Sequence, residues 1–118
     1  MSEKKSIVAE KSFQFSLKII SLYKELIRDN EYVISKQLLR CATSIGANIE
    51  EALAGQTKKD FTAKMSIASK EARETRYWLR LLDKSQFIRK NYTEYLKDIE
   101  DLVSMLTAIV KTSQQNQK

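Results

Sequence analysis

The residues of this sequence that could take part in binding chemistry are cations on and just after a predicted helix over residues 59–83. A step of about 100° per residue places these cations within an arc of roughly 120° on one side of that helix. The predicted nucleic-acid-binding set is Lys59, Lys70, Arg73, Arg76, Tyr77, Arg80 and Lys84. Cations contact a phosphate backbone, and an exposed aromatic ring can stack on an unpaired base. The same pattern is also typical of a solvated helix face, and the sequence contains no nucleic-acid-binding motif that would decide between the two interpretations.

A second polar set lies at helical spacing on the preceding segment, residues 33–54, and on the other side of the 59–83 helix. If these two helices are antiparallel and turn near Gln56, Arg40 lies level with Glu71 and Ala72, and Leu38 lies level with Glu74. An ion pair from Arg40 to Glu71 or Glu74 is therefore expected. The set could form a polar site, but a network that fixes the register of two helices is the favoured interpretation. The predicted interhelix network comprises Arg40, Ser44, Asn48, Glu51, Glu71 and Glu74.

The composition argues against catalysis. The chain has no histidine, so the commonest general base is missing, as are the Glu-x-x-His pairs of carboxylate di-iron bundles. Its single cysteine, Cys41, falls in an apolar stripe and is interpreted as a small core residue, and zinc sites require more ligands than this chain supplies. Neither a glycine-rich phosphate loop nor a Ser-His-Asp set is present. We therefore predict a protein that is not an enzyme and that holds no metal or cofactor.

The charge of the chain indicates which partners to expect. The net charge of +6 favours polyanions, namely RNA, DNA or an acidic membrane surface. No apolar run approaches the ~20 residues that a membrane span requires. The N-terminus is charged and no signal-like apolar segment follows it, which leads us to expect a cytoplasmic protein.

Long helices must position these side chains, because the sequence contains no proline and only two glycines, Gly46 and Gly55. Apolar periodicity predicts helices near residues 7–29, 33–54, 59–83 and 91–113, followed by a polar tail over 112–118 that frays. Gly55 is expected to end the second helix in a left-handed conformation. Because the connections are short, we predict an all-α, antiparallel, up-down-up-down four-helix bundle that forms a single domain over residues 1–118.

The first predicted helix carries more apolar surface than one bundle core can cover. One stripe is formed by Phe13, Leu17, Ile20 and Ile27, and a second by Phe15, Ile19, Leu22 and Leu26. Together they cover roughly 220° of the helix. The long third connection or the N-terminal arm could cover the excess, but a subunit interface is the favoured interpretation. The interface is predicted to consist of Phe15, Ile19, Leu22 and Leu26, with Ile67 and Trp78 from the third helix.

Two segments carry a family resemblance. Residues 37–52 read QLLRCATSIGANIEEA and resemble the pattern Q-L-x-R-A-x-x-S-I-x-A-N-I-x-E-G, with departures at Gly46 and Ala52. Residues 61–82 read FTAKMSIASKEARETRYWLRLL and resemble the form S-I-A-x-K-E-x-x-E-T-x-Y-W-L-x-L-L. Both patterns belong to the bacterial four helix bundle protein family, also called the ribosomal RNA intervening-sequence protein family.

The resemblance implies a homopentamer with a barrel-like shape and a central channel. Members of this family are encoded in insertions within large-subunit ribosomal RNA genes or elsewhere in bacterial genomes. A related branch, the accessory variability protein of diversity-generating retroelements, is basic and binds a reverse transcriptase and RNA. We therefore expect a homo-oligomeric scaffold that binds structured RNA, or an RNA-protein complex, through the basic stripe. The alternative is a protein-interaction scaffold, for instance for a reverse transcriptase, without direct binding of RNA or DNA.

Overall fold

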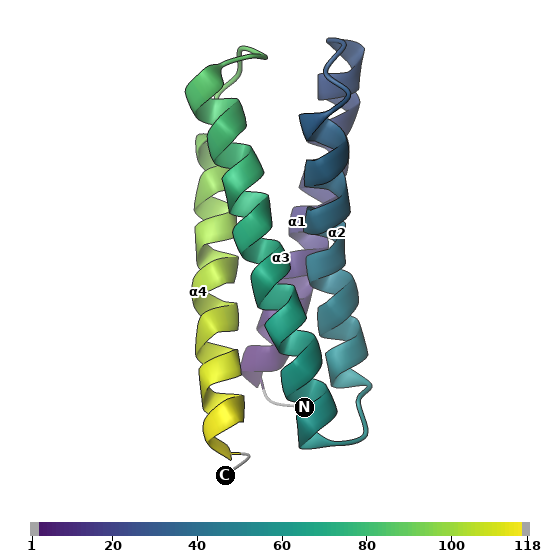
Figure 1. Ribbon diagram of the computed structural model, residues 1–118, viewed down its shortest axis with the longest axis vertical. Helices are drawn as coiled ribbons and strands as arrows, with labels where there is room; N and C mark the ends of the chain where they lie inside the picture. The colour runs from purple at the N-terminus through teal and green to yellow at the C-terminus, as the bar shows by residue number, and fades with distance from the viewer. Residues whose placement is uncertain (1–2, 117–118) are drawn as a thin grey trace.

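The computed structural model describes residues 3–116, and all of its regular structure is helical (Figure 1). The four helices are α1 (Glu3–Arg28), α2 (Ile34–Leu53), α3 (Lys58–Ser85) and α4 (Thr93–Asn116). The prediction of an all-α protein with four helices is confirmed. Helix α4 continues to Asn116, so residues 112–116 of the predicted polar tail are helical and do not fray. Residues 1, 2, 117 and 118 of the predicted domain lie outside the described residues.

The helices are arranged as a square in cross-section. Contacts join α1 to α2, α2 to α3, α3 to α4, and α4 back to α1, so α1 and α3 are diagonal neighbours. Figure 1 shows the α1–α2 and α3–α4 connections at one end of the molecule, and the α2–α3 connection and both termini at the other. Residue numbers rise along α2 as they fall along its partner, since Arg40 pairs with Glu71 and Glu51 pairs with Lys64. Consecutive helices therefore run in opposite directions along a body of 48 × 21 × 21 Å.

Side chains in the connections define where α2 and α3 begin. The buried carboxylate of Glu31 accepts hydrogen bonds of 2.7 Å from the backbone N–H groups of Ile34 and Ser35. These are donors that the first turn of a helix leaves without intrahelical partners, and a carboxylate there also suits the helix dipole. The hydroxyl of Thr57 accepts from the N–H of Asp60 at 3.0 Å and so caps α3.

Gly55 does not have the left-handed conformation predicted for it. The left-handed residues of the described chain are Asn30, with φ of 67°, and Gln86, with φ of 47°. Gly55 instead lies where the chain turns tightly between α2 and α3. A Cβ at this position would lie 3.1 Å from the carbonyl oxygen of Ala52, so close approach of the backbone is the constraint that this glycine meets.

The buried side of α1 is the reverse of the predicted one. Phe15, Ile19, Leu22 and Leu26 lie in the core of the single chain, so they cannot form a surface between copies. The stripe left on the surface contains Phe13, 57% exposed, and Leu17, 46% exposed. The reason is the rotation of α1 about its axis: Ser12, on the buried side, packs against Gly46 of α2, and the other apolar stripe is thereby turned toward solvent. Of the remaining predicted interface residues, Ile67 is 42% exposed and Trp78 is partly buried against the core.

The contact between α1 and α4 is the least extensive of the four, and ion pairs reinforce it. The Nζ of Lys18 pairs with Asp98 at 2.8 Å and also with Glu94, and these two carboxylates raise the pKa of the lysine. Near the C-terminal end of α1, Glu25 pairs with Lys90 at 2.8 Å, which raises the pKa of Lys90. These pairs hold α1 against α4 and the connection that precedes it.

Across the described residues, none of the helices has the length and apolar character that crossing a membrane would demand.

Candidate nucleic-acid-binding face

The basic side chains predicted from the sequence lie on the part of α3 that faces away from the core and toward α4. This helix is buried along Met65, Ala68, Ala72 and Leu79, and it has α2 on one flank and α4 on the other. In Figure 1 it is the helix nearest the viewer. Two of its predicted cations turn onto α4: Arg73 donates to the Oγ1 of Thr107 at 3.0 Å, and Arg76 pairs with Glu100 at 3.3 Å.

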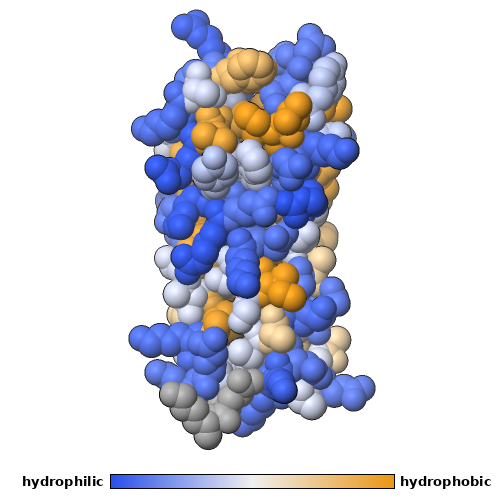
Figure 2. Space-filling view, in the orientation of Figure 1, coloured by the Kyte–Doolittle hydropathy of each residue, from blue (hydrophilic) through white to orange (hydrophobic). Residues whose placement is uncertain are grey.

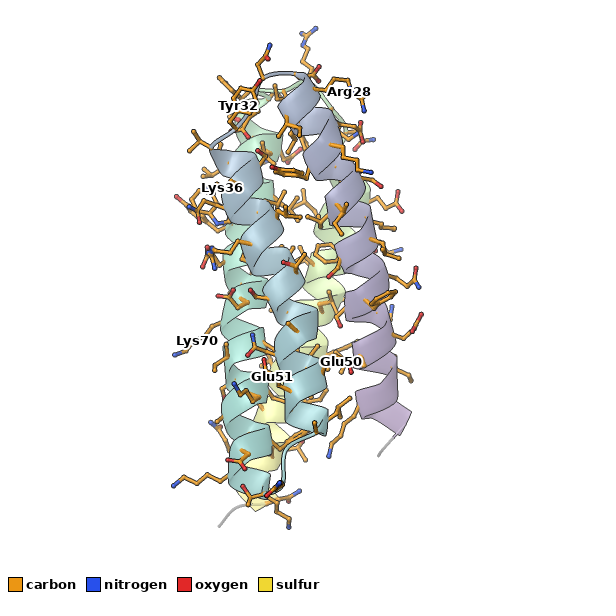
Figure 3. All side chains as sticks on the ribbon, turned by 90° about the vertical axis from the view of Figure 1, so that its right-hand side faces the viewer. Arg28, Tyr32, Lys36, Glu50, Glu51 and Lys70 are labelled. Carbon is orange, nitrogen blue, oxygen red and sulfur yellow. The ribbon has the colours of Figure 1, made fainter. Side chains whose placement is uncertain are left out.

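The other four predicted cations have no acidic partner within the described residues 3–116. These exposed side chains, which we call the cationic ridge, are Lys59, Lys70, Arg80 and Lys84. Figure 3 shows Lys70 extending away from the bundle. From Lys70 to Lys84 the ridge rises by 14 residue steps along the helix, a length of about 21 Å at 1.5 Å per residue.

The charge of the chain is concentrated on this helix. Helix α3 contains eight lysines and arginines against four aspartates and glutamates, a difference of +4 out of a net +6 for the whole chain. Two of those four acids, Glu71 and Glu74, are bound to Arg40 of α2. The field of the ridge is therefore weakly compensated by its own helix, which favours the approach of a polyanion.

The opposite flank of α3 holds the interhelix network. The guanidinium of Arg40 lies 3.3 Å from the carboxylate of Glu71 and also pairs with Glu74. The indole N–H of Trp78 donates to the same Glu74 carboxylate at 3.0 Å. Each carboxylate on this flank thus has a partner within the fold, and the arrangement ties α2 to α3 at one register.

The remaining predicted network residues bond elsewhere. The hydroxyl of Ser44 donates to the Arg40 carbonyl, and the amide of Asn48 donates to the Ser44 carbonyl, each at 2.8 Å within α2. Glu51 pairs with Lys64 at 3.1 Å. Lys64 is not part of the network predicted from the sequence. The antiparallel register that places Arg40 near Glu71 also places Lys64 near Glu51.

Tyr77 lies beside the ridge and supplies its aromatic surface. Its ring packs edge-on against Trp78, with 5.2 Å between centroids and 71° between planes. Trp78 is partly buried, so this contact supports Tyr77 while 52% of the tyrosine stays exposed. Figure 2 shows hydrophilic side chains covering most of the face that α3 presents, with separate apolar patches between them. A supported ring between cations is a surface on which an unpaired base can stack.

The described residues were predicted to include no metal site, and their only cysteine is a core residue. Among them there is no group of three or more metal-ligating side chains. Cys41 is fully buried and accepts a hydrogen bond from the hydroxyl of Thr75 at 3.1 Å. Burial raises the pKa of its thiol to about 11, so the side chain stays protonated and unreactive near neutral pH.

Comparison with known proteins places the chain in a family. Residues 4–108 match the family described as 23S rRNA-intervening sequence protein. A crystal structure of a protein of unknown function from the S23 ribosomal protein family of Bacteroides thetaiotaomicron is 44% identical, covers 92% of this chain and 98% of its own, and superposes with a TM-score of 0.86. Among curated proteins, none matches the sequence. With most of its length matched, the chain belongs to the 23S rRNA-intervening sequence protein family.

Proposed function

We propose that this chain is a non-catalytic scaffold that binds structured RNA, or an RNA-protein complex, through the cationic ridge of α3. The observation that carries the proposal is that Lys59, Lys70, Arg80 and Lys84 are exposed on one helix without acidic partners in the described part of the chain. A phosphate backbone would supply the missing negative charge and release its counterions on binding. The family description, which refers to sequences intervening in 23S rRNA, supports RNA as the polyanion.

The proposed scaffold is a homo-oligomer, with the pentamer that the family resemblance implies as the expected size. Its support is the outer stripe of α1, which we define as the exposed side chains Ile7, Phe13, Leu17 and Ile20. Four large apolar side chains on one exposed helix face are typical of an association surface. Assembly would also present several ridges in one particle, and linked binding sites raise affinity without new contacts.

The test is a titration of the protein into a fluorescently labelled, hairpin-rich RNA over a series of salt concentrations. The variant carries Lys70→Gln, Arg80→Gln and Lys84→Gln together. Each phosphate contact contributes about 0.7–0.9 to the slope of log affinity against log salt, so this slope should become shallower by about 2. Affinity at low salt should fall by about ten-fold or more.

A matched control removes the same charge from elsewhere on the molecule. Lys11, Lys24 and Lys36 are exposed on α1 and α2 and have no acidic partner among the described residues. Changing these three to glutamine lowers the net charge equally and should leave most of the salt dependence unchanged. Equal losses in the two triple variants would show that net charge alone attracts RNA, and no measurable binding at low salt would refute the proposal.

The alternative is a protein-interaction scaffold that acts, for instance, beside a reverse transcriptase without contacting nucleic acid. The outer stripe of α1 favours this alternative, because an apolar helix face suits a protein partner. Stoichiometric co-purification of the chain with a reverse transcriptase, together with the absence of RNA binding, would favour it over the ridge proposal.

A further inference from the structure

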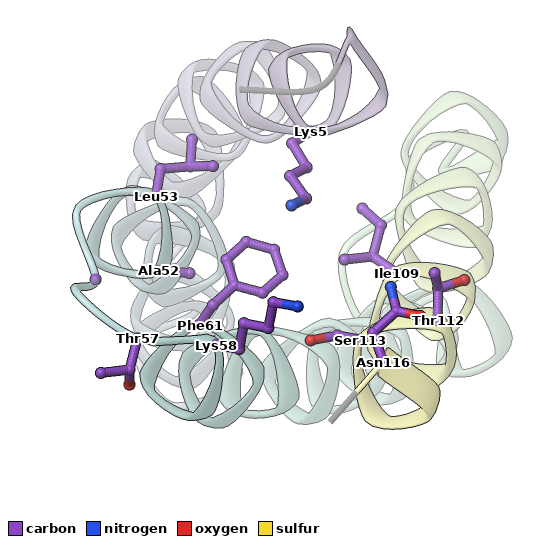
Figure 4. A pocket seen from close by; sticks show the side chains of 11 residues that line it. Lys5, Ala52, Leu53, Thr57, Lys58, Phe61, Ile109, Thr112, Ser113 and Asn116 are labelled. Carbon is purple, nitrogen blue, oxygen red and sulfur yellow. The ribbon is translucent and has the colours of Figure 1, made fainter. Parts of the chain in front are cut away.

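The two ends of the bundle present phenylalanine rings differently. At the end with the chain termini a pocket of about 480 Å³ opens, and Figure 4 shows the Phe61 ring turned into it between Leu53 and Ile109. The Nζ of Lys5 lies over that ring, 4.2 Å from its centroid. At the other end, Phe87 of the α3–α4 connection is 69% exposed. The Phe61 ring is therefore covered by the fold, whereas the Phe87 ring is open to a partner.

Hydrogen bonds hold the segment around Phe87 in one conformation. The side-chain amide of Gln86 donates to the carbonyl of Asp83 at 2.8 Å and to the carbonyl of Lys90 at 3.1 Å. The side-chain oxygen of Gln86 accepts from the N–H of Lys90 at 3.2 Å, and the N–H of Phe87 donates to the hydroxyl of Ser85 at 3.2 Å. Gln86 thus joins the two sides of the turn, and Phe87 projects from a connection with a defined shape.

The residue after Phe87 turns the other way. Ile88 is partly buried against the core, and its carbonyl accepts from the hydroxyl of the buried Tyr92 at 2.9 Å. The connection therefore anchors itself with Ile88 and leaves Phe87 in water. A ring that is already held in place loses little freedom when it binds a partner.

Cations lie close to this ring in the chain. Residues 83–90 contain Lys84, Arg89 and Lys90 but a single acid. Lys90 pairs with Glu25 of α1, whereas Lys84 and Arg89 are exposed and have no acidic partner in the described part of the chain. Lys84 is the last cation of the ridge and comes three residues before Phe87. The cations of α3 thus lead to an exposed aromatic ring with another cation two residues beyond it.

We infer that Phe87 stacks on an unpaired base of the RNA whose phosphates contact the ridge, and that Lys84 and Arg89 contact the phosphates next to that base. Paired stems are recognised through shape and phosphates, whereas unpaired bases stack on aromatic rings. The inference rests on the proposed RNA binding and adds the substrate class, a stem that continues into a single strand. One ring between Gln86 and the anchored Ile88 suits one base better than a lipid surface, which takes up a broad apolar face.

Two labelled RNAs that share one stem provide the test: a blunt-ended duplex, and the same duplex with a single-stranded oligouridine extension. The parent protein should bind the extended RNA about ten-fold more tightly, because the extension supplies a base that can stack. Phe87→Ala should remove most of this preference and keep the affinity for the blunt duplex within about two-fold of the parent. Phe87→Trp should retain the preference, whereas Phe87→Leu, which keeps apolar bulk without a ring, should lose it.

The matched control is Tyr32→Ala. Tyr32 is 60% exposed on the α1–α2 connection at the same end of the bundle, but it follows Asp29 and Glu31 and lies outside the ridge. Its removal should leave the affinity for both RNAs unchanged. Equal losses of the preference in Tyr32→Ala and Phe87→Ala would overturn the inference.

Photo-cross-linking identifies the contact directly. With 5-iodouridine in the extension, irradiation should join the RNA to Phe87, and mass spectrometry of the peptides should locate the link. Cross-links confined to other residues would contradict stacking on this ring.

The outcomes separate this inference from the proposal on which it rests. If neither RNA bound the parent protein, both would fail. If the triple ridge variant weakened both RNAs while Phe87→Ala kept the full preference for the extension, the ridge proposal would stand and the stacking inference alone would be wrong. Vesicles of phosphatidylserine and phosphatidylcholine test the other surface. If Phe87→Ala lost binding to these vesicles and kept its RNA affinities, the ring would belong to a membrane contact and the inference would be refuted.

Discussion

Helices α1 and α3 present opposite kinds of surface. The outer stripe of α1 exposes Ile7, Phe13, Leu17 and Ile20, whereas the ridge of α3 exposes lysine and arginine side chains that no described carboxylate neutralises. Neither feature is needed for a single bundle to fold in water, because these exposed side chains do not pack in the core of that bundle. Under the proposed function, the two surfaces serve two kinds of partner: a protein surface for α1 and a polyanion for α3.

The position of these helices makes the two roles compatible. Helices α1 and α3 lie diagonally in the square, and their main chains stay apart, although the Lys5 side chain of α1 reaches the Phe61 ring of α3. A second copy that bound the outer stripe would therefore cover α1 and leave the ridge open. Mutations on α1 should then affect association, and mutations on α3 should affect RNA binding, independently of one another.

The largest expected effect distinguishes the two stripes of α1. Leu22→Ala opens a cavity at a fully buried position and should lower the free energy of unfolding by about 2–5 kcal/mol. Leu17→Ala changes a side chain that is 46% exposed and should cost less than about 1 kcal/mol. Urea unfolding of the two variants is the measurement. Equal losses would mean that both stripes are covered in the folded protein and that α1 has no free apolar face.

Sequence periodicity predicted four helices but could not choose between the two stripes of α1. Both stripes repeat at helical spacing, so either could face the axis of the bundle. The choice is made by close packing: Ser12 meets Gly46 across the α1–α2 contact, and this rotates Phe15 and Ile19 inward. A pattern within one helix contains no information on how a neighbour of matching shape rotates it.

The candidate site shows a similar division. Antiparallel pairing predicted an ion pair from Arg40 to Glu71 or Glu74, because the register between two adjacent helices follows from the position of their turn, and Arg40 pairs with both. The orientations of Arg73 and Arg76 depend on Thr107 and Glu100 of α4, a third element whose register the sequence did not fix.

Alkaline pH would discharge the lysines of the ridge, but it should also destabilise the fold. Burial raises the pKa of the Cys41 thiol from 9.0 to about 11 and that of the Tyr92 hydroxyl from 10.0 to about 12. Because the folded chain keeps protons that the unfolded chain releases, this stability is complete below about pH 9 and is lost as pH rises toward 12. Urea unfolding at pH 10.5 should give a free energy about 2–3 kcal/mol below that at pH 8.

Replacing the cysteine tests the cause of this alkaline loss. Cys41→Ala should lower stability at pH 8 and should flatten the decline between pH 9 and 11, which then depends mainly on Tyr92. A decline of the same steepness in Cys41→Ala would assign the loss to other groups. Mutation of the ridge residues, assayed near neutral pH, removes their charge without this loss of stability.

A charge placed on the outer stripe should separate assembly from RNA binding. Leu17→Glu should convert the oligomer to a monomer in light scattering, because association would bury the new carboxylate. The affinity for RNA should fall by about ten-fold through lost multivalency, although the ridge itself is intact. The matched control is Ile67→Glu, which makes the same change at a 42% exposed position on α3. Dissociation by Ile67→Glu but not by Leu17→Glu would place the interface on α3.

The smallest effect compares the two flanks of α3. Glu74 accepts from Arg40 and from the indole of Trp78, so Glu74→Gln removes an ion pair while the glutamine oxygen can still accept from the indole. Because the pair is partly exposed, unfolding free energy should fall by about 0.5–1 kcal/mol. Arg80, on the ridge, has no partner to lose among the described residues. Arg80→Gln should therefore keep the free energy of unfolding within about 0.5 kcal/mol of the parent while it weakens RNA binding. If Arg80→Gln destabilised the chain as much as Glu74→Gln, the ridge would be holding the fold together and would not be free for a phosphate backbone.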